Sequence, residues 1–152
     1  MTAVANEGTV YQYTLLNRLE DSDGNVLQTF EPQVRNQIDV LDTEEWNAIH
    51  SGMRMVVENT KEFDGFPIEA AGKTGTAQQD GHANHGLFVG YAPYDDPEIT
   101  IAVRIANGYN SHNAATAARN VISYYYKETS MKDIKEMKAA GANGNIRNSV
   151  AD

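Results

Sequence analysis

The sequence contains no cysteine among its 152 residues, which excludes disulfide bonds, thiolate metal sites and cysteine nucleophiles. Basic residues are few, with 12 Lys and Arg against 21 Asp and Glu, and the formal net charge is −9. A nucleic-acid partner is therefore not expected, because binding one requires a basic surface, and an anionic membrane surface would repel the chain. No stretch approaches the roughly 18 apolar residues of a membrane-spanning helix. The sequence also shows no signal-peptide pattern and no membrane anchor.

The composition is that of one ordinary globular domain. Hydrophobic residues make up 41% and charged residues 22%, which excludes a disordered polar chain. A domain of this length buries about 70% of the surface that its unfolded chain exposes. The apolar periodicity is lost after residue 128, where glycine and asparagine accumulate. We therefore expect residues 128–152 to form a polar, mobile tail.

The first forty residues predict a helix end followed by strands. Residues 1–8 have the pattern of a helix that Gly8 terminates, and residues 10–16 predict a strand. Turn-forming residues then cluster at 20–25, before a second extended run begins. This arrangement predicts a hairpin with its tip at Asp23-Gly24.

The remainder predicts two helices and three strands. Asp42 is a good N-cap for a helix over residues 43–58, whose apolar stripe is formed by Trp46, Ile49, Met53 and Val56. Extended runs at 68–78, 86–93 and 98–107 predict an antiparallel meander, and residues 114–127 predict a last helix capped by Ser111 or Asn113. The fold class is therefore α+β, with helices covering an antiparallel sheet.

One unusual segment is AGKTGTAQ at residues 71–78. It is not a phosphate-binding loop, because that motif requires a glycine at position 67, where Pro67 stands, and a helix after the lysine. His82 and His85 lie near Asp80 but lack a third ligand at a clear spacing, so we expect no metal site. Nothing in the sequence indicates a cofactor.

The same segment can line a groove from a sheet strand. The Lys73 ammonium would attract a substrate carboxylate, and the hydroxyls of Thr74 and Thr76 could donate hydrogen bonds to it. Gly75 would let another chain approach closely, so that a peptide-like substrate could pair with the strand. The triplet alone leaves open a simpler interpretation, in which this is an edge strand with a solvated lysine.

Several segments together resemble the class B penicillin-binding proteins, the monofunctional transpeptidases of peptidoglycan synthesis. The resemblance covers residues 4–127. In the order of that family, it includes residues 4–11 (with Glu7 in place of a glycine), 52–57, 71–78, 85–93, the strand at 99–107 and the helix at 114–126. We therefore expect residues 1–127 to form the C-terminal part of a transpeptidase domain, with part of the penicillin-binding-protein/β-lactamase-like fold.

The resemblance implies a serine D,D-transpeptidase that forms an acyl-enzyme with peptidoglycan stem peptides ending in D-Ala-D-Ala, and that binds β-lactams. It implies catalytic roles for Lys73 and Thr76, whose backbone N–H would be one oxyanion donor. It implies substrate binding by Lys73, Thr74, Gly75 and Thr76. The family also implies a location at the extracytoplasmic face of the bacterial membrane.

The family's nucleophile motif, Ser-x-x-Lys, is absent from the sequence, because no lysine has a serine three residues before it. Ser111-His112-Asn113 spells the second motif, Ser-x-Asn, but it follows Lys73, whereas the family places that motif earlier. We therefore expect the chain alone to be inactive and its partner to be the N-terminal half of the transpeptidase domain. Without that half, an apolar face would be exposed. The alternative is a truncated fragment that serves as a non-catalytic binding or interaction module.

Overall fold

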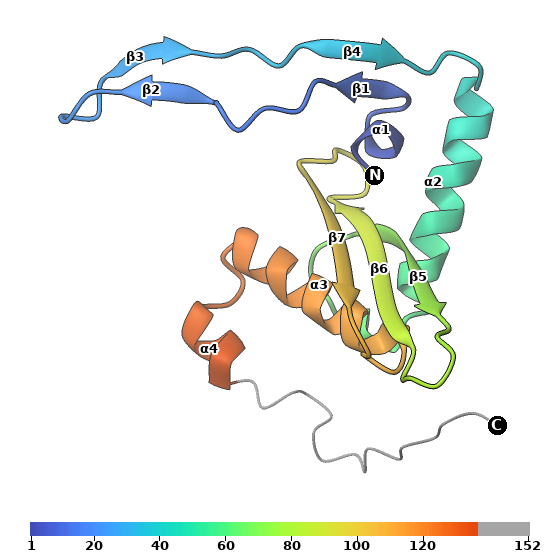
Figure 1. Ribbon diagram of the computed structural model, residues 1–152. Helices are drawn as coiled ribbons and strands as arrows, with labels where there is room; N and C mark the ends of the chain where they lie inside the picture. Colours follow the sequence, from blue (N-terminus) through green and yellow to red (C-terminus); the bar gives the residue numbers. More distant parts are fainter. Residues whose placement is uncertain (137–152) are drawn as a thin grey trace.

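The computed structural model describes residues 1–136. These residues form a body, in which helices surround a three-stranded sheet, and a long two-stranded ribbon that extends from it (Figure 1). The predicted α+β class is confirmed. None of the described helices is long and apolar enough to span a membrane. Residues 137–152 of the predicted tail lie outside the described residues.

The chain begins with a short helix, α1 (Thr2–Ala5), which ends as predicted before Gly8. The Gly8 N–H donates to the Ala3 carbonyl at 2.7 Å, and its φ of +95° belongs to the left-handed region. A Cβ at this position would lie 2.3 Å from the Ile38 carbonyl oxygen. Only glycine fits between α1 and the returning ribbon.

The ribbon consists of two antiparallel strand pairs. In the inner pair β1 (Thr9–Tyr11) joins β4 (Val34–Gln37), and in the outer pair β2 (Arg18–Glu20) joins β3 (Val26–Thr29). The predicted hairpin is confirmed, with residues 21–25 as its tip. The strand predicted for residues 10–16 is too long, because the chain turns at Thr14, whose hydroxyl accepts from the Leu16 N–H at 3.0 Å.

Helix α2 (Thr43–Glu58) has the predicted bounds. Asp42 and Glu45 form a capping box, in which each side chain accepts from the other residue's backbone N–H at 2.9 Å. Of the predicted stripe, Trp46 is buried and Met53 and Val56 are partly buried, whereas Ile49 is exposed. Val57, which was not predicted, is also buried. His50 takes part in the inner face, where its Nε2 lies 2.8 Å from the Val4 carbonyl oxygen.

The three predicted strands form the antiparallel meander β5-β6-β7, and their bounds are Ala71–Ala77, His85–Ala92 and Ile99–Ile105. A short 3-10 helix, η1 (Lys61–Phe63), lies between α2 and β5. Helix α3 (Ser111–Tyr125) begins earlier than predicted, because Asn110 is its N-cap and accepts from the His112 N–H at 3.0 Å. Within the predicted tail lies another helix, α4 (Met131–Glu136), which the sequence did not predict.

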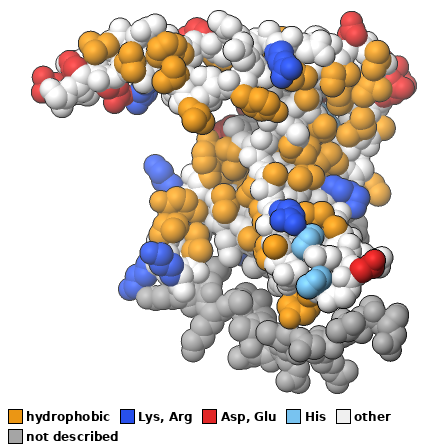
Figure 2. Space-filling view, in the orientation of Figure 1, with side chains coloured by type: hydrophobic (Ala, Val, Ile, Leu, Met, Phe, Trp, Pro, Cys, Tyr) orange, Lys and Arg blue, Asp and Glu red, His pale blue; other side chains and the backbone are white. Residues whose placement is uncertain are grey.

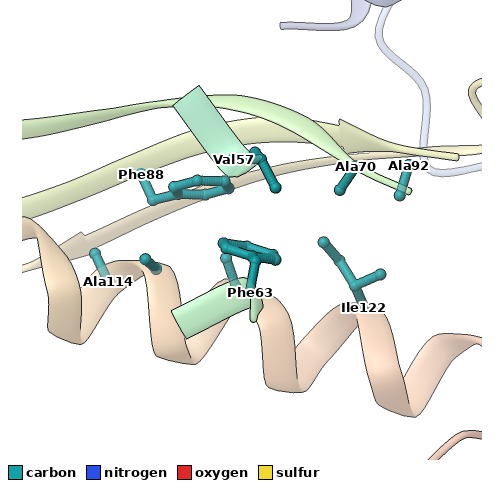
Figure 3. Close-up of a cluster of buried hydrophobic side chains, with 9 residues drawn as sticks. Val57, Phe63, Ala70, Phe88, Ala92, Ala114 and Ile122 are labelled. Atoms are coloured by element: carbon teal, nitrogen blue, oxygen red, sulfur yellow. The ribbon is translucent and has the colours of Figure 1, made fainter. Parts of the chain in front are cut away.

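The main core lies between the sheet and α3 (Figure 3). Phe88 of β6 stacks on Phe63 of η1 with ring centroids 5.5 Å apart, and Ile122 of α3 fills the adjacent space. Small residues on α3, which include Ala114 and Ala118, allow the helix to approach the sheet closely. This core therefore fixes β6, the central strand, and through it the neighbouring strand β5.

A smaller cluster joins the two helices at the N-terminal end to the start of β5. Tyr91 is fully buried there, in contact with Ala5 and Ala71, and its ring lies 5.5 Å from that of His50. Its hydroxyl oxygen has no hydrogen-bond partner among the described residues. Burial, with smaller contributions from Tyr94 and Glu7, raises the pKa of the Tyr91 hydroxyl from 10.0 to about 12.

Substituting Tyr91→Phe is expected to stabilise the fold by about 1 kcal/mol, because it removes a buried hydroxyl that lacks a partner. At alkaline pH the substituted protein should also lose less of its free energy of unfolding than the wild type does. The raised pKa of Tyr91 contributes stability that is complete below about pH 10 and is lost as the pH rises towards 12. Part of this loss should remain, because burial also raises the pKa of Tyr126 to about 12.

Urea unfolding of both proteins at pH 8 and pH 11 measures these effects. The matched control is Tyr126→Phe, which removes a hydroxyl that donates to the Ala92 carbonyl at 3.2 Å, and should destabilise the fold instead. A loss of stability in Tyr91→Phe equal to that in the control would mean that the Tyr91 hydroxyl is paired.

Candidate functional site

Lys73, Thr74, Gly75 and Thr76 lie on β5, which is an edge strand of the described sheet and pairs there with β6. The Ala71 carbonyl oxygen points towards β6, since it lies 2.5 Å from the place a Cβ on Gly90 would take. Backbone groups of successive residues in a strand point to opposite sides. The backbone N–H and C=O groups of Thr74 and Thr76 therefore point away from β6, towards the open edge.

The Lys73 side chain lies over this open edge. It is exposed, and its Nζ donates to the Thr74 carbonyl at 2.7 Å. The strand thus carries a positive charge, two threonines and outward-facing backbone groups. The register places the Lys73 side chain on one face of the sheet and the side chains of Thr74 and Thr76 on the other, since Thr74 pairs with the core residue Phe88. Such an edge can hold an extended peptide by main-chain hydrogen bonds and its carboxylate by charge.

The glycines of β5 have different surroundings. A Cβ on Gly72 would lie 2.5 Å from the Phe88 ring and 2.7 Å from the Val89 carbonyl oxygen, so this position must remain glycine for β5 to pack. A Cβ on Gly75 would meet only Leu87, at 3.4 Å. The space beside Gly75 is therefore open, which is compatible with the predicted approach of a substrate.

Beside Lys73 lies an open groove of about 390 Å³ on the sheet face opposite the main core. Its lining follows the strand register, in which Lys73 pairs with Val89 and Gly75 pairs with Leu87, which in turn pairs with Arg104. Figure 2 shows hydrophobic and basic side chains next to one another on the body. The predicted exposed apolar face is confirmed here and, more extensively, along the ribbon.

The groove residues Leu87, Val89 and Arg104 were not predicted as site residues. The strand at 98–107 did indicate that Arg104 lies opposite the apolar side of its strand and faces solvent or the groove. Pairing partners depend on the register of β5, β6 and β7, which alternation within one strand does not reveal. The alternation did carry a signal, because it assigned Arg104 to the opposite side of the strand from Val103 and Ile105.

Arg54 of α2 fixes the start of β5. Its Nη1 donates to the Ala70 carbonyl at 3.1 Å, and its Nε lies 3.1 Å from a Glu58 carboxylate oxygen. Its guanidinium also lies 5.9 Å from the centre of the Tyr94 ring. The helix is therefore tied to the residue that directly precedes the Lys73 strand.

The remaining candidate residues serve the fold. Among residues 1–136 there is no group of three His, Cys, Asp or Glu residues that could hold a metal ion. His85 Nδ1 accepts from the Asn107 N–H at 3.0 Å. In the first turn of α3, Asn113 donates to the Gly108 carbonyl, and His112 Nδ1 lies 2.9 Å from a Glu62 carboxylate oxygen. The Ser-x-Asn sequence at 111–113 therefore lies in the first turn of α3.

Comparison with known proteins identifies relatives of this chain. The family profile for the penicillin binding protein transpeptidase domain matches residues 1–123. The peptidoglycan D,D-transpeptidase MrdA of Haemophilus influenzae is 32% identical over 150 residues, which cover 84% of this chain and 22% of the relative. Penicillin-binding protein 2B of Streptococcus pneumoniae is 30% identical over 117 residues, which cover 68% of this chain and 17% of the relative. The chain thus spans about a fifth of the length of these curated relatives.

Solved structures agree with this assignment. Penicillin-binding protein 2B from Streptococcus pneumoniae superposes with a TM-score of 0.71 at 24% identity, over 85% of this chain and 24% of that chain, and shows the shared fold. The D,D-transpeptidase domain of a peptidoglycan glycosyltransferase from Eggerthella lenta has a TM-score of 0.68 at 26% identity, over 84% of this chain and 30% of that chain. The chain therefore belongs to the penicillin-binding protein transpeptidase family.

Proposed function

We propose that this chain is the C-terminal segment of a peptidoglycan D,D-transpeptidase and supplies its Lys-Thr-Gly substrate-binding strand. The observation that carries the proposal is the open edge of β5, where Lys73 lies beside the outward-facing backbone groups of Thr74 and Thr76. The alternative of a solvated lysine on an ordinary edge strand does not account for the adjoining groove.

Each residue of the motif has a distinct role in this proposal. Lys73 places a positive charge beside the nucleophile and influences proton transfer there. Thr74 and Thr76 donate to the terminal carboxylate of a stem peptide or β-lactam. The Thr76 N–H serves as one oxyanion donor, for which a typical contribution is about 3 kcal/mol of the barrier. Gly75 leaves room for the substrate backbone.

The nucleophilic serine would come from a Ser-x-x-Lys motif in the N-terminal half of the domain, since the motif does not occur in this sequence. That serine would attack the carbonyl of the penultimate D-alanine and release the terminal D-alanine. An amine of a second stem peptide would then resolve the acyl-enzyme and form the cross-link. The corresponding location is the extracytoplasmic face of the bacterial membrane, where peptidoglycan stem peptides occur.

β-Lactams are the expected inhibitors. One structural relative, penicillin-binding protein A from M. tuberculosis, has been solved as an imipenem acyl-enzyme complex and as a penicillin G acyl-enzyme complex. A β-lactam carboxylate has the same charge and size as the peptide carboxylate, so the β5 edge would accept both. Metal ions and organic cofactors have no role in this mechanism.

Labelling with a fluorescent penicillin tests the proposal. The 152-residue chain alone should take up no covalent label, and the label should appear when the N-terminal half of the domain is added. The label should then reside on the added half, which gel electrophoresis of the two polypeptides resolves. Label on this chain alone would show that it carries its own nucleophile.

A non-catalytic interaction module is the second candidate, and the exposed apolar side chains of the ribbon favour it. This candidate predicts that the two halves bind each other, as measured by size-exclusion chromatography, without any labelling. Binding accompanied by labelling would support the transpeptidase instead.

A further inference from the structure

The outer part of the ribbon is exposed along both strands. Every residue of β2 and β3 is exposed, and the apolar side chains Leu19, Val26 and Leu27 are among them. Figure 1 shows this pair at the end of the ribbon farthest from α2. An isolated two-stranded ribbon has little stability in water, and an unpaired strand edge is a template for pairing with another chain.

The hydrogen bonds of the ribbon identify the free groups of β2. Asn17 is turned towards β3, because its carbonyl accepts from the Phe30 N–H at 2.8 Å. Asp21 is also turned inwards, because its N–H donates to the Asn25 carbonyl at 3.0 Å. Leu27 of β3 is the extra residue of a bulge and has no partner in β2. The backbone groups of β2 therefore alternate regularly between the two sides of the strand from residue 17 to residue 21. The backbone groups of Arg18 and Glu20 therefore point outwards.

These two outward residues carry opposite charges, and their side chains form an ion pair on one face of β2. We propose that β2 is a self-recognition edge, at which a second copy of this chain pairs antiparallel about a two-fold axis through Leu19. Arg18 of each copy then lies opposite Glu20 of the other, and each such pair exchanges both of its backbone hydrogen bonds.

Charge selects this register. Moving the second strand by two residues would place Arg18 opposite Arg18, and like charges in directly opposed positions are unfavourable. The edge of β3 offers no comparable selection, because none of the residues Val26–Thr29 is charged. The paired segment is short and far smaller than a stable protein interface, so the association is a transient one that a covalent trap can capture.

Because the chain has no cysteine of its own, a single introduced cysteine can serve as that trap. Leu19 lies on the axis in a non-hydrogen-bonded position, where opposed Cα atoms are about 4.5 Å apart, within the range of a disulfide. In the full chain, Leu19→Cys should form a disulfide-linked dimer under mild oxidation, at a rate that rises with protein concentration. Leu27→Cys is the matched control. Leu27 is more exposed than Leu19, at 67% against 46%, so exposure alone would favour cross-linking at Leu27. Pairing at β2 predicts instead that Leu27→Cys cross-links at least tenfold more slowly.

Charge reversal then tests the register. Adding Arg18→Glu to the Leu19→Cys variant should slow cross-linking at least fivefold, and adding Glu20→Arg as well should restore the rate. Arg35→Glu on β4 makes the same change in net charge away from this edge and should have a much smaller effect. Equal rates for the Leu19→Cys and Leu27→Cys variants, or slowing that the double charge swap does not rescue, would overturn the proposal.

Discussion

Replacing Lys73 with alanine is expected to reduce the rate of β-lactam acylation in the reconstituted domain by about 100-fold or more. The side chain extends over the open edge of β5, with Nζ 2.7 Å from the Thr74 carbonyl oxygen. A positioned group that assists proton transfer typically contributes about 100-fold to 10,000-fold to a rate. The loss of its charge should also weaken the attraction for the carboxylate of the incoming ligand.

The rate of fluorescent penicillin labelling at several drug concentrations measures this effect and separates binding from acylation. Lys61→Ala is the matched control, because Lys61 is an exposed lysine on η1 and does not line the groove. The Lys73 variant should fold normally, since the Lys73 side chain is exposed and, among the described residues, donates a hydrogen bond to the neighbouring Thr74 carbonyl alone. Labelling at the wild-type rate in the Lys73 variant would remove this residue from the proposed mechanism.

The sequence predicts best the elements whose signals are local. Helix α2 was predicted to the residue, because Asp42 and Glu45 supply a capping box at its start. The three strands of the meander were predicted by their alternation and by the turn residues between them. The segment containing Lys73 was predicted as an extended run, and its order among neighbouring segments that resemble one family then indicated its role.

Features that depend on distant partners were not predictable from the same signals. Strand β4 has the sequence VRNQ, which does not alternate clearly, and it exists because β1 pairs with it. His50 faces inwards because the Val4 carbonyl of α1 lies 2.8 Å from its ring nitrogen. The groove beside Lys73 requires the register of three strands, and no single strand contains that information.

Replacing Phe88 with alanine is expected to destabilise the chain by about 3–5 kcal/mol, a large share of the roughly 5–15 kcal/mol that stabilises a typical domain. The Phe88 side chain is fully buried and stacks on Phe63. Its ring also lies against Gly72 and Gly90, where an added Cβ would come within 2.5 Å and 2.9 Å of ring atoms, respectively. These glycines have no side chains that could move into the space, so the cavity would remain and β5 would lose the surface on which Gly72 rests.

Urea unfolding monitored by the fluorescence of Trp46, the single tryptophan, measures this loss, because Trp46 is buried on α2. Val121→Ala is the matched control, since Val121 is 52% exposed on α3 and its truncation should cost well under about 1 kcal/mol. If Phe88→Ala does not fold, Phe88→Leu retains most of the volume and should cost about 1–1.5 kcal/mol. A Phe88 variant as stable as the Val121 variant would mean that the packing of α3 on β6 does not hold β5 in place, and the open edge would then need another support.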